Sequence, residues 1–418
     1  MKSYATSLVC DGCGKEYSLR MPINLCPYCG DLLETTYDLA ALKRDGAKIT
    51  VPGGNRSIWC YRPLLPPVEE ENIVTLGEGQ TPLTKSVIIG PMLGMEHLYF
   101  KNDTLMPTGS FKDRGFSLAV SFARDIGVRR GFTYSSGNAG ASFSAYSARG
   151  GFDALVLIEY QASDVKKSML ALYGVNAVIL NFESFSQITE MLDYGVRELG
   201  LYQFVNFINP IRHEAMKTYA YEIAGQLGRA PDHMLHPVGT GGGLWGTWKG
   251  FRELYDLGLV DRLPKMSGVQ PQEVCWMKQA IDSGALTGSP YGDSTKTIAQ
   301  SISGNAPLKG GRRLLSCVRE SGGAAEGVSD NEILAAMRLL AREGIAAEPS
   351  AAASVAALIK LVEGGTVRTD ETAVCVITGT SLKQPGAVQQ AADQPKETIN
   401  ADGRELKNLV DRIFAKEK

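Results

Sequence analysis

Hydrophobic residues recur in two alternating patterns between residues 112 and 206. Spacings of three and four residues predict helices over 112–126, 139–149, 163–173 and 184–199. Short apolar runs between them predict strands over 131–135, 154–158 and 176–180. Because helices and strands alternate, we expect parallel strands joined by right-handed crossovers. This stretch is interpreted as a small α/β domain over residues 112–209.

A second alternating stretch starts near residue 210 and predicts a larger α/β domain. Its expected helices and strands cover 213–227, 233–238, 244–257, 266–270, 273–282, 329–342, 350–363 and 372–378. An extended loop over 75–83 and a strand over 98–101 precede the small domain. We therefore assign residues 58–111 and 210–390 to the large domain, and residues 391–418 to a C-terminal tail with a peripheral helix.

Four cysteines are grouped near the N-terminus, in a segment over 1–57 that also has a short helix pattern. Cys10 and Cys13 form one CxxC pair, and Cys26 and Cys29 form a second. Each tight turn directs two thiolates to one point, which suits tetrahedral zinc. A segment this small needs more than its own core to fold. We predict a zinc-ribbon-like knuckle with a structural Zn²⁺; two disulfides, or a ribbon that no longer holds metal, are the alternatives.

The composition is that of a soluble globular protein large enough for two domains. Of 418 residues, 44% are hydrophobic and 21% are charged. A formal net charge of −2 argues against nucleic acid as the main partner. No apolar run reaches the roughly 20 residues that a membrane span needs, and the first residues lack the apolar region of a signal peptide. We expect a cytoplasmic protein with neither a membrane nor a nucleic acid as partner.

A single lysine, Lys112, stands at the predicted start of the helix over 112–126. Pro107 and Gly109 mark a turn just before it. Backbone N–H groups and the positive end of the helix dipole favour an anionic ligand there and lower the pKa of an amine. Such a lysine suits a Schiff base with an aldehyde cofactor, although a lone lysine at a helix start is more often simply solvated.

Three further segments lie at the ends of predicted strands, and they favour a cofactor-binding lysine over a solvated one. The first is Ser135, Ser136, Gly137 and Asn138, and the second is Gly239, Thr240, Gly241, Gly242 and Gly243. Both stand between a strand and a helix, where backbone N–H groups can surround an anion and the Asn138 amide can meet a phenolic oxygen. The third is Thr378, whose hydroxyl ends a buried strand at the edge where open α/β sheets bind ligands.

In this order and spacing, the segments resemble the fold-type II pyridoxal 5′-phosphate (PLP) enzymes, the group of tryptophan synthase β and cysteine synthase. Within that group they are most similar to the threonine synthases. The motifs that carry this likeness lie at 75–83, 107–115, 206–212, 217–218, 320–323, 348–350 and 378–383. The resemblance covers roughly residues 58–390. It implies an α/β fold with two parallel-sheet, three-layer domains, and a homodimer.

The resemblance also implies roles for the candidate residues. Lys112 would hold PLP and then act as base and acid at the substrate's Cα. Residues 239–243 would bind the phosphate of PLP, Asn138 its phenolic oxygen and Thr378 its ring nitrogen. Ser135, Ser136 and Gly137 would receive the substrate carboxylate, unless the serines only cap the strand end. Arg212 and Lys217 would bind the anionic end of the substrate, unless they form ordinary salt bridges.

Full likeness to the threonine synthases would imply conversion of O-phospho-L-homoserine and water to L-threonine and phosphate. Two positions depart from their usual pattern: Phe207 replaces a serine, and Thr240 lies in a GTGGG loop where GNAGN is usual. Both changes remove groups that help to bind the substrate's phosphate. They support an alternative, a β- or γ-replacement or a serine/threonine dehydratase-type elimination on another activated amino acid. An inactive scaffold is disfavoured because Lys112, Asn138 and Thr378 are all present.

Overall fold

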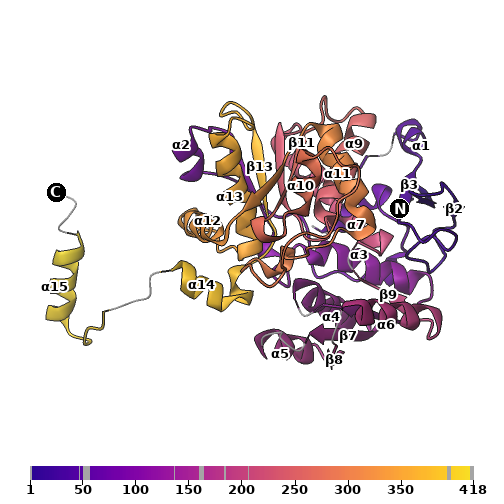
Figure 1. Ribbon diagram of the computed structural model, residues 1–418, viewed down its shortest axis with the longest axis horizontal. Coiled ribbons are helices and arrows are strands. Elements are labelled where there is room, and N and C mark those ends of the chain that lie inside the picture. The colour runs from indigo at the N-terminus through magenta and orange to yellow at the C-terminus, as the bar shows by residue number, and fades with distance from the viewer. Residues whose placement is uncertain are drawn as a thin grey trace.

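The computed structural model describes residues 2–46, 48–49, 57–135, 137–159, 164–182, 185–205, 207–392 and 397–414. Within these residues the strands form three sheets, shown in Figure 1. The candidate residue Ser136 lies outside the described residues, as does Asn206 of the 206–212 motif. Among the described helices, none combines the length and apolar character that crossing a bilayer requires.

The strands and helices have the following bounds. The strands are β1 Ala5–Cys10, β2 Glu16–Tyr17, β3 Leu33–Tyr37, β4 Leu83–Lys85, β5 Leu98–Asn102, β6 Arg130–Tyr134, β7 Asp153–Glu159, β8 Asn176–Leu180, β9 Tyr202–Gln203, β10 His233–Pro237, β11 Lys265–Pro271, β12 Ala325–Val328 and β13 Ala373–Ile377. The helices are α1 Leu39–Arg44, α2 Ile89–Leu93, α3 Lys112–Asp125, α4 Asn138–Gly150, α5 Asp164–Leu172, α6 Phe185–Arg197, α7 Pro210–Met216, α8 Thr218–Leu227, α9 Gly242–Asp256, α10 Trp276–Asp282, α11 Arg312–Ser321, α12 Asp330–Arg342, α13 Pro349–Glu363, α14 Pro385–Ala391 and α15 Gly403–Phe414.

The largest sheet has six strands in the order β12-β11-β10-β13-β5-β4. Its strands are parallel except β4, which pairs antiparallel with β5 at the edge. Every residue of β10 and β13 is buried, because helices such as α9 and α13 pack on the sheet. The carboxyl ends of these central strands lead into the glycine loop and Thr378, so the sheet positions both candidate segments.

A second sheet has four parallel strands in the order β8-β7-β6-β9. Its core contains closely packed aromatic rings, with Phe143 and Phe204 at 4.7 Å between ring centroids. Helix α3 packs against both α4 and α7, and so connects this sheet to the rest of the body. The predicted parallel sheets are therefore confirmed, while the predicted domain boundaries stay predictions.

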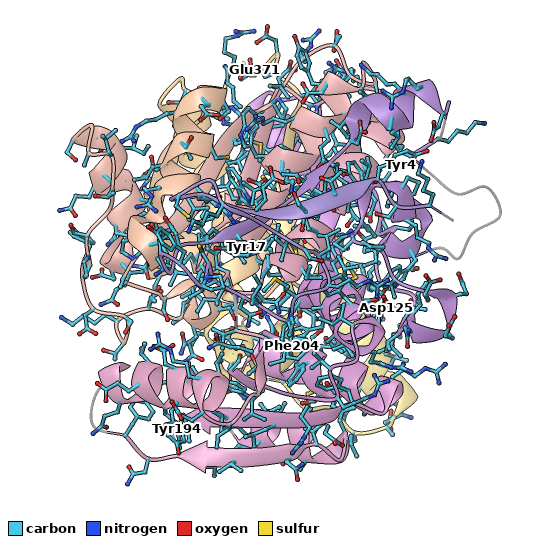
Figure 2. The ribbon with its side chains drawn as sticks, turned by 90° about the vertical axis from the view of Figure 1, so that its right-hand side faces the viewer. Tyr4, Tyr17, Asp125, Tyr194, Phe204 and Glu371 are labelled. Carbon is cyan, nitrogen blue, oxygen red and sulfur yellow. The ribbon has the colours of Figure 1, made fainter. Side chains whose placement is uncertain are left out.

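The third sheet is the small antiparallel knuckle β2-β1-β3, which carries the four N-terminal cysteines. Figure 2 views the molecule from this side, with Tyr17 of β2 near its centre and Tyr194 of α6 in the lower layer. Tyr37 of β3 donates a hydrogen bond to Glu214 of α7 at 2.8 Å. Asp11 beside the cysteines forms a salt bridge with Arg313 of α11. The knuckle therefore docks on the body through polar contacts, and Leu32 also packs in the hydrophobic core of the body.

Several predicted bounds differ from the structure. The helix predicted over 213–227 is two helices, α7 and α8, which meet at Lys217. Helix α7 starts earlier because Pro210 fits its first turn and the Asn209 side chain caps it. Strands β4 and β12 and helix α11 had no counterpart in the prediction. The tail contains α15, a helix whose apolar residues remain exposed.

Candidate active site

One cavity brings together most of the predicted site residues. Lys112, Arg212, residues 239–243 and Thr378 all line it, at the carboxyl edge of the large sheet. Phe207, His213 and Glu348 also line it, although no role for His213 or Glu348 was predicted. Glu348 belongs to the 348–350 motif, so a signal existed for it. For His213 the only signal was its place beside Arg212.

Lys112 is the first residue of α3, and the turn before it is held by hydrogen bonds. The Asp113 carboxylate accepts from the backbone N–H of Thr108 at 2.7 Å and from its hydroxyl at 2.6 Å. The backbone N–H of Phe111 donates to the carbonyl of Thr378 at 2.9 Å. These contacts fix the lysine backbone relative to the end of β13.

The amine of Lys112 is free to react. In the described part of the chain it has no hydrogen bond or ion pair, and its nitrogen lies 4.0 Å from the centre of the Phe111 ring. Burial and the positive charge of Arg212, partly offset by Glu348, lower the pKa of Lys112 to about 7. Near neutral pH a large share of this amine is therefore uncharged and nucleophilic.

The glycine loop between β10 and α9 forms a cradle of backbone N–H groups. Gly241 has φ +87°, and a Cβ there would lie 2.3 Å from Leu314 Cδ1, so only glycine fits. No described residue accepts a hydrogen bond from the N–H groups of Gly239, Thr240 or Gly241. These donors stand at the N-terminus of α9, a 15-residue helix, where an anion is favoured.

Glu348 connects Asn138 to the end of β13, where Thr378 lies. The Asn138 amide donates to both carboxylate oxygens of Glu348, at 2.9 and 3.0 Å. The backbone N–H of Glu348 in turn donates to the carbonyl of Gly379, next to Thr378. Asn138 does not itself line the cavity, and its amide is held by a lining carboxylate that had no predicted role.

Three other predicted substrate ligands lie elsewhere. Lys217 is fully buried and forms ion pairs with Glu214 at 2.8 Å and Glu253 at 2.9 Å. Ser135 and Gly137 precede α4 and do not line the cavity, and the Ser135 hydroxyl accepts from the N–H of Gly137 at 3.2 Å. The contacts of Lys217 favour a structural role.

Comparison with known proteins identifies the family. The model for pyridoxal-phosphate dependent enzymes matches residues 74–379. The chain belongs to this family. The threonine synthase of Methanosarcina acetivorans is 40% identical over 98% of this chain and 99% of its own length. That of Methanocaldococcus jannaschii is 38% identical over 97% of this chain and 99% of its own length.

Solved structures agree on the fold of this PLP-dependent enzyme. Threonine deaminase isoform 2 from Solanum lycopersicum superposes with a TM-score of 0.63 at 18% identity, covering 78% of this chain and 91% of that one. Serine racemase from Dictyostelium discoideum has a TM-score of 0.59 at 25% identity, covering 72% of this chain and 92% of that one. The fold-type II architecture predicted from the sequence is confirmed.

The residues of the cavity fit PLP, which has an aldehyde, a phosphate and a pyridine ring. The free amine of Lys112 is the group that an aldehyde requires. The unpaired N–H groups of Gly239, Thr240 and Gly241 match a phosphate. Thr378, at the end of β13, offers a neutral hydroxyl beside the same cavity. These donors can therefore hold the cofactor that the family uses.

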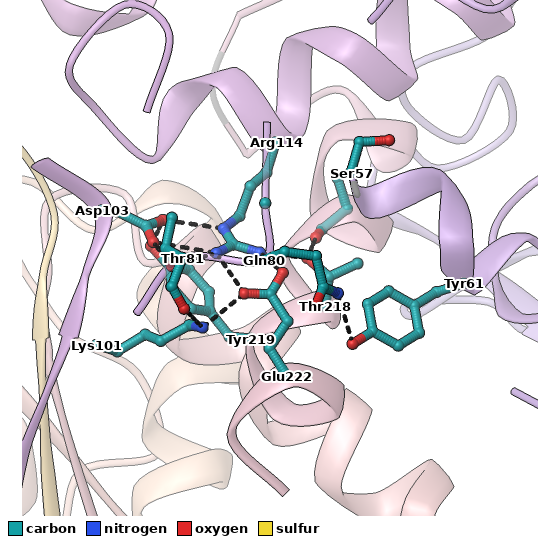
Figure 3. Close-up of polar contacts among 12 residues, drawn as sticks. Ser57, Tyr61, Gln80, Thr81, Lys101, Asp103, Arg114, Thr218, Tyr219 and Glu222 are labelled. Carbon is teal, nitrogen blue, oxygen red and sulfur yellow. Dashed lines mark hydrogen bonds and ion pairs between the residues drawn. The ribbon is translucent and has the colours of Figure 1, made fainter. Parts of the chain in front are cut away.

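A buried network of ion pairs stabilises helix α3 of this PLP-dependent enzyme, the helix that begins at Lys112 (Figure 3). Arg114 donates to Asp103 at 2.9 and 3.0 Å and to Glu222, while Lys101 pairs with Glu222 at 2.6 Å. The Tyr219 hydroxyl donates to Asp103 at 2.6 Å. Although burial raises it, Arg114 and Lys101 lower the pKa of Glu222 to about 2. The network therefore stays charged and joins β5, α3 and α8.

The four knuckle cysteines form one cluster. Their sulfur atoms all lie within 4.8 Å of one another. The sulfurs of Cys10 and Cys29 are 3.3 Å apart, and those of Cys13 and Cys26 are 3.7 Å apart. These separations are compatible with four thiolates around one tetrahedral ion, and they exclude disulfides among these pairs in this structure.

Proposed function

We propose that this enzyme is a threonine synthase that converts O-phospho-L-homoserine and water to L-threonine and phosphate. The observation that carries the proposal is the similarity along nearly the whole chain to relatives with that name. The cavity supports it, because a free lysine amine faces anion-binding N–H groups there.

The chemistry at Cα would depend on Lys112. PLP, when bound, supplies an electron sink for charge that develops beside the substrate's amine. Lys112 would hold the cofactor covalently and, once displaced by the substrate, would take a proton from Cα and return it. Both tasks require an amine that is uncharged near neutral pH, and its pKa of about 7 meets that requirement.

Arg212 is the positive group available to the substrate's phosphate. Its guanidinium lies 4.0 Å from the centre of the Phe116 ring and donates to the Phe204 carbonyl at 2.7 Å. Its Nε is buried and has no partner among the described residues. Burial lowers the pKa of Arg212 to about 9, so it is still charged at neutral pH and gains from an anionic ligand.

Phe207 supports the second candidate, replacement or elimination on another activated amino acid. Its ring lines the cavity, where a serine hydroxyl is usual in the threonine synthases. An aromatic ring cannot donate a hydrogen bond to a phosphate, so this substitution favours a different leaving group.

The test uses the purified enzyme loaded with PLP. We expect O-phospho-L-homoserine to change the cofactor absorbance while L-threonine and phosphate appear in equal amounts. O-phospho-L-serine and L-serine are compared in parallel. Turnover of either one, without turnover of phosphohomoserine, would replace the proposed function with the second candidate.

We also propose that Cys10, Cys13, Cys26 and Cys29 hold one structural Zn²⁺, on the basis of their close sulfur atoms. Four thiolates leave no open position for catalysis. Metal analysis of the purified protein tests this proposal, with one zinc per chain as the expected result. The expected homodimer and cytoplasmic location stay predictions.

A further inference from the structure

The wall of the cavity around Phe207 has a polar atom without a partner. His213 is 5% exposed, and its Nε2 has no hydrogen-bond partner among the described residues. The Phe207 ring packs against the imidazole in a tilted arrangement, at 4.7 Å between centroids. A Cβ on Gly242 would lie 3.6 Å from His213 Cδ2, the carbon bonded to Nε2. The Nε2 edge of the ring therefore faces the glycine loop.

The other ring nitrogen of His213 fixes where the proton lies. His213 Nδ1 is 3.5 Å from Arg313 Nη1. A guanidinium can only donate, so Nδ1 must be the unprotonated acceptor and Nε2 must carry the hydrogen. Burial, followed by the charge of Arg313, lowers the pKa of His213 well below its ordinary value, which keeps the ring neutral.

Arg313 is itself held by the N-terminal knuckle. Its Nη2 donates to Asp11 Oδ1 at 2.7 Å, and its Nε donates to the other oxygen of the same carboxylate. Asp11 stands between Cys10 and Cys13 in the cysteine cluster. The guanidinium also lies 5.3 Å from the centre of the Trp245 ring. A bidentate contact and an aromatic face therefore leave Arg313 in one orientation.

We infer that His213 Nε2–H binds an oxyanion in the cavity, and that Asp11 and Arg313 hold the imidazole in the donating tautomer. We identify that oxyanion as the phosphate of O-phospho-L-homoserine. This identification rests on the proposed function. His213 then supplies a hydrogen-bond donor on the wall where Phe207 replaces the usual serine. It is a specificity-determining residue, and Asp11 and Arg313 are positioning residues.

Binding to the PLP-loaded enzyme tests the donor. His213→Leu is expected to weaken binding of inorganic phosphate and of O-phospho-L-homoserine by roughly 10- to 100-fold, the range for a hydrogen bond to a charged group. The affinity for L-homoserine, which has no phosphate, should not change. His213→Gln, which keeps an N–H donor, should recover part of the loss. Unchanged phosphate affinity, or an equal loss for L-homoserine, would overturn the inference.

Imidazole ¹⁵N spectra of the same holoenzyme test the tautomer without any ligand. The chain has four histidines, so the His213 signals are assigned by their absence in His213→Gln. We expect a protonated Nε2 and a bare Nδ1, and a mixture of tautomers in Arg313→Met and Asp11→Asn. A protonated Nδ1 in the unaltered protein would contradict the positioning role of Asp11 and Arg313.

The two measurements separate this inference from the proposed function. If no variant forms L-threonine but phosphate binding still depends on His213, the oxyanion donor stands and the threonine synthase assignment fails. If L-threonine forms normally in His213→Leu with an unchanged KM, the assignment stands and the donor fails.

Discussion

The cavity has two walls that the chain builds in different ways. The cofactor wall consists of Lys112, the glycine loop over 239–243 and Thr378, each at a junction of strand and helix. The oxyanion wall consists of Phe207, Arg212 and His213, and the orientation of His213 depends on a contact between residues 302 positions apart, Asp11 and Arg313. Local backbone geometry determines the first wall. Side-chain contacts between distant segments determine the second.

The largest effect expected is on the cofactor wall. Lys112→Ala removes the amine that holds the cofactor and moves the proton at Cα, so turnover should fall by at least about 1000-fold. The purified variant should also lose the absorbance of protein-bound PLP. Affinity for inorganic phosphate at the oxyanion wall should remain, if the two walls are independent. A variant that retains more than a tenth of the activity would contradict the role of Lys112.

Substitution of Arg114 tests whether the buried ion network stabilises the fold around the cofactor wall. Arg114→Met leaves Asp103 and part of Glu222 buried without their main partner, so the free energy of unfolding should fall by about 3–5 kcal/mol. Urea denaturation measures the loss. Arg262→Met is the matched control, because Arg262 pairs with Asp261 but is 52% exposed, and should change stability by less than about 1 kcal/mol. Equal losses in the two variants would show that the network does not support the fold.

These two walls also explain what could be predicted from the sequence. Lys112 starts a helix, the glycine loop joins a strand to a helix and Thr378 follows a strand, and such positions have local signals in glycine, hydroxyl and apolar spacing. No local signal of this kind marked His213, and only its motif marked Glu348, because their roles come from partners on other elements. Lys217 is the opposite case, a residue with a sequence signal of function whose contacts in the fold are structural. Its motif suggested a ligand, but Glu214 and Glu253 surround its amine in the folded chain.

The pH dependence of cofactor loading tests the electrostatics of Lys112. Only the uncharged amine reacts with an aldehyde, and the pKa of Lys112 is lowered to about 7. The loading rate of apoprotein should therefore rise roughly fiftyfold from pH 5 to pH 7 and level off above about pH 8. Arg212→Met removes a nearby positive charge and should move the midpoint to higher pH. A midpoint near the ordinary lysine value would show that the amine is solvated.

The smallest effect is expected from the knuckle, whose link to His213 runs through Asp11 and Arg313. Removal of bound metal with a chelator, or Cys13→Ser, should loosen the segment that holds Asp11. KM for O-phospho-L-homoserine should then rise by roughly two- to tenfold, the lower part of the range for coupling between separate sites. Absorbance of bound PLP and kcat should stay unchanged, because the cofactor wall makes none of these contacts. Cys60→Ser, outside the cluster, is the control and should change none of the three quantities. If bound PLP were lost together with the rise in KM, the knuckle would stabilise the whole body. The two walls would then not respond independently.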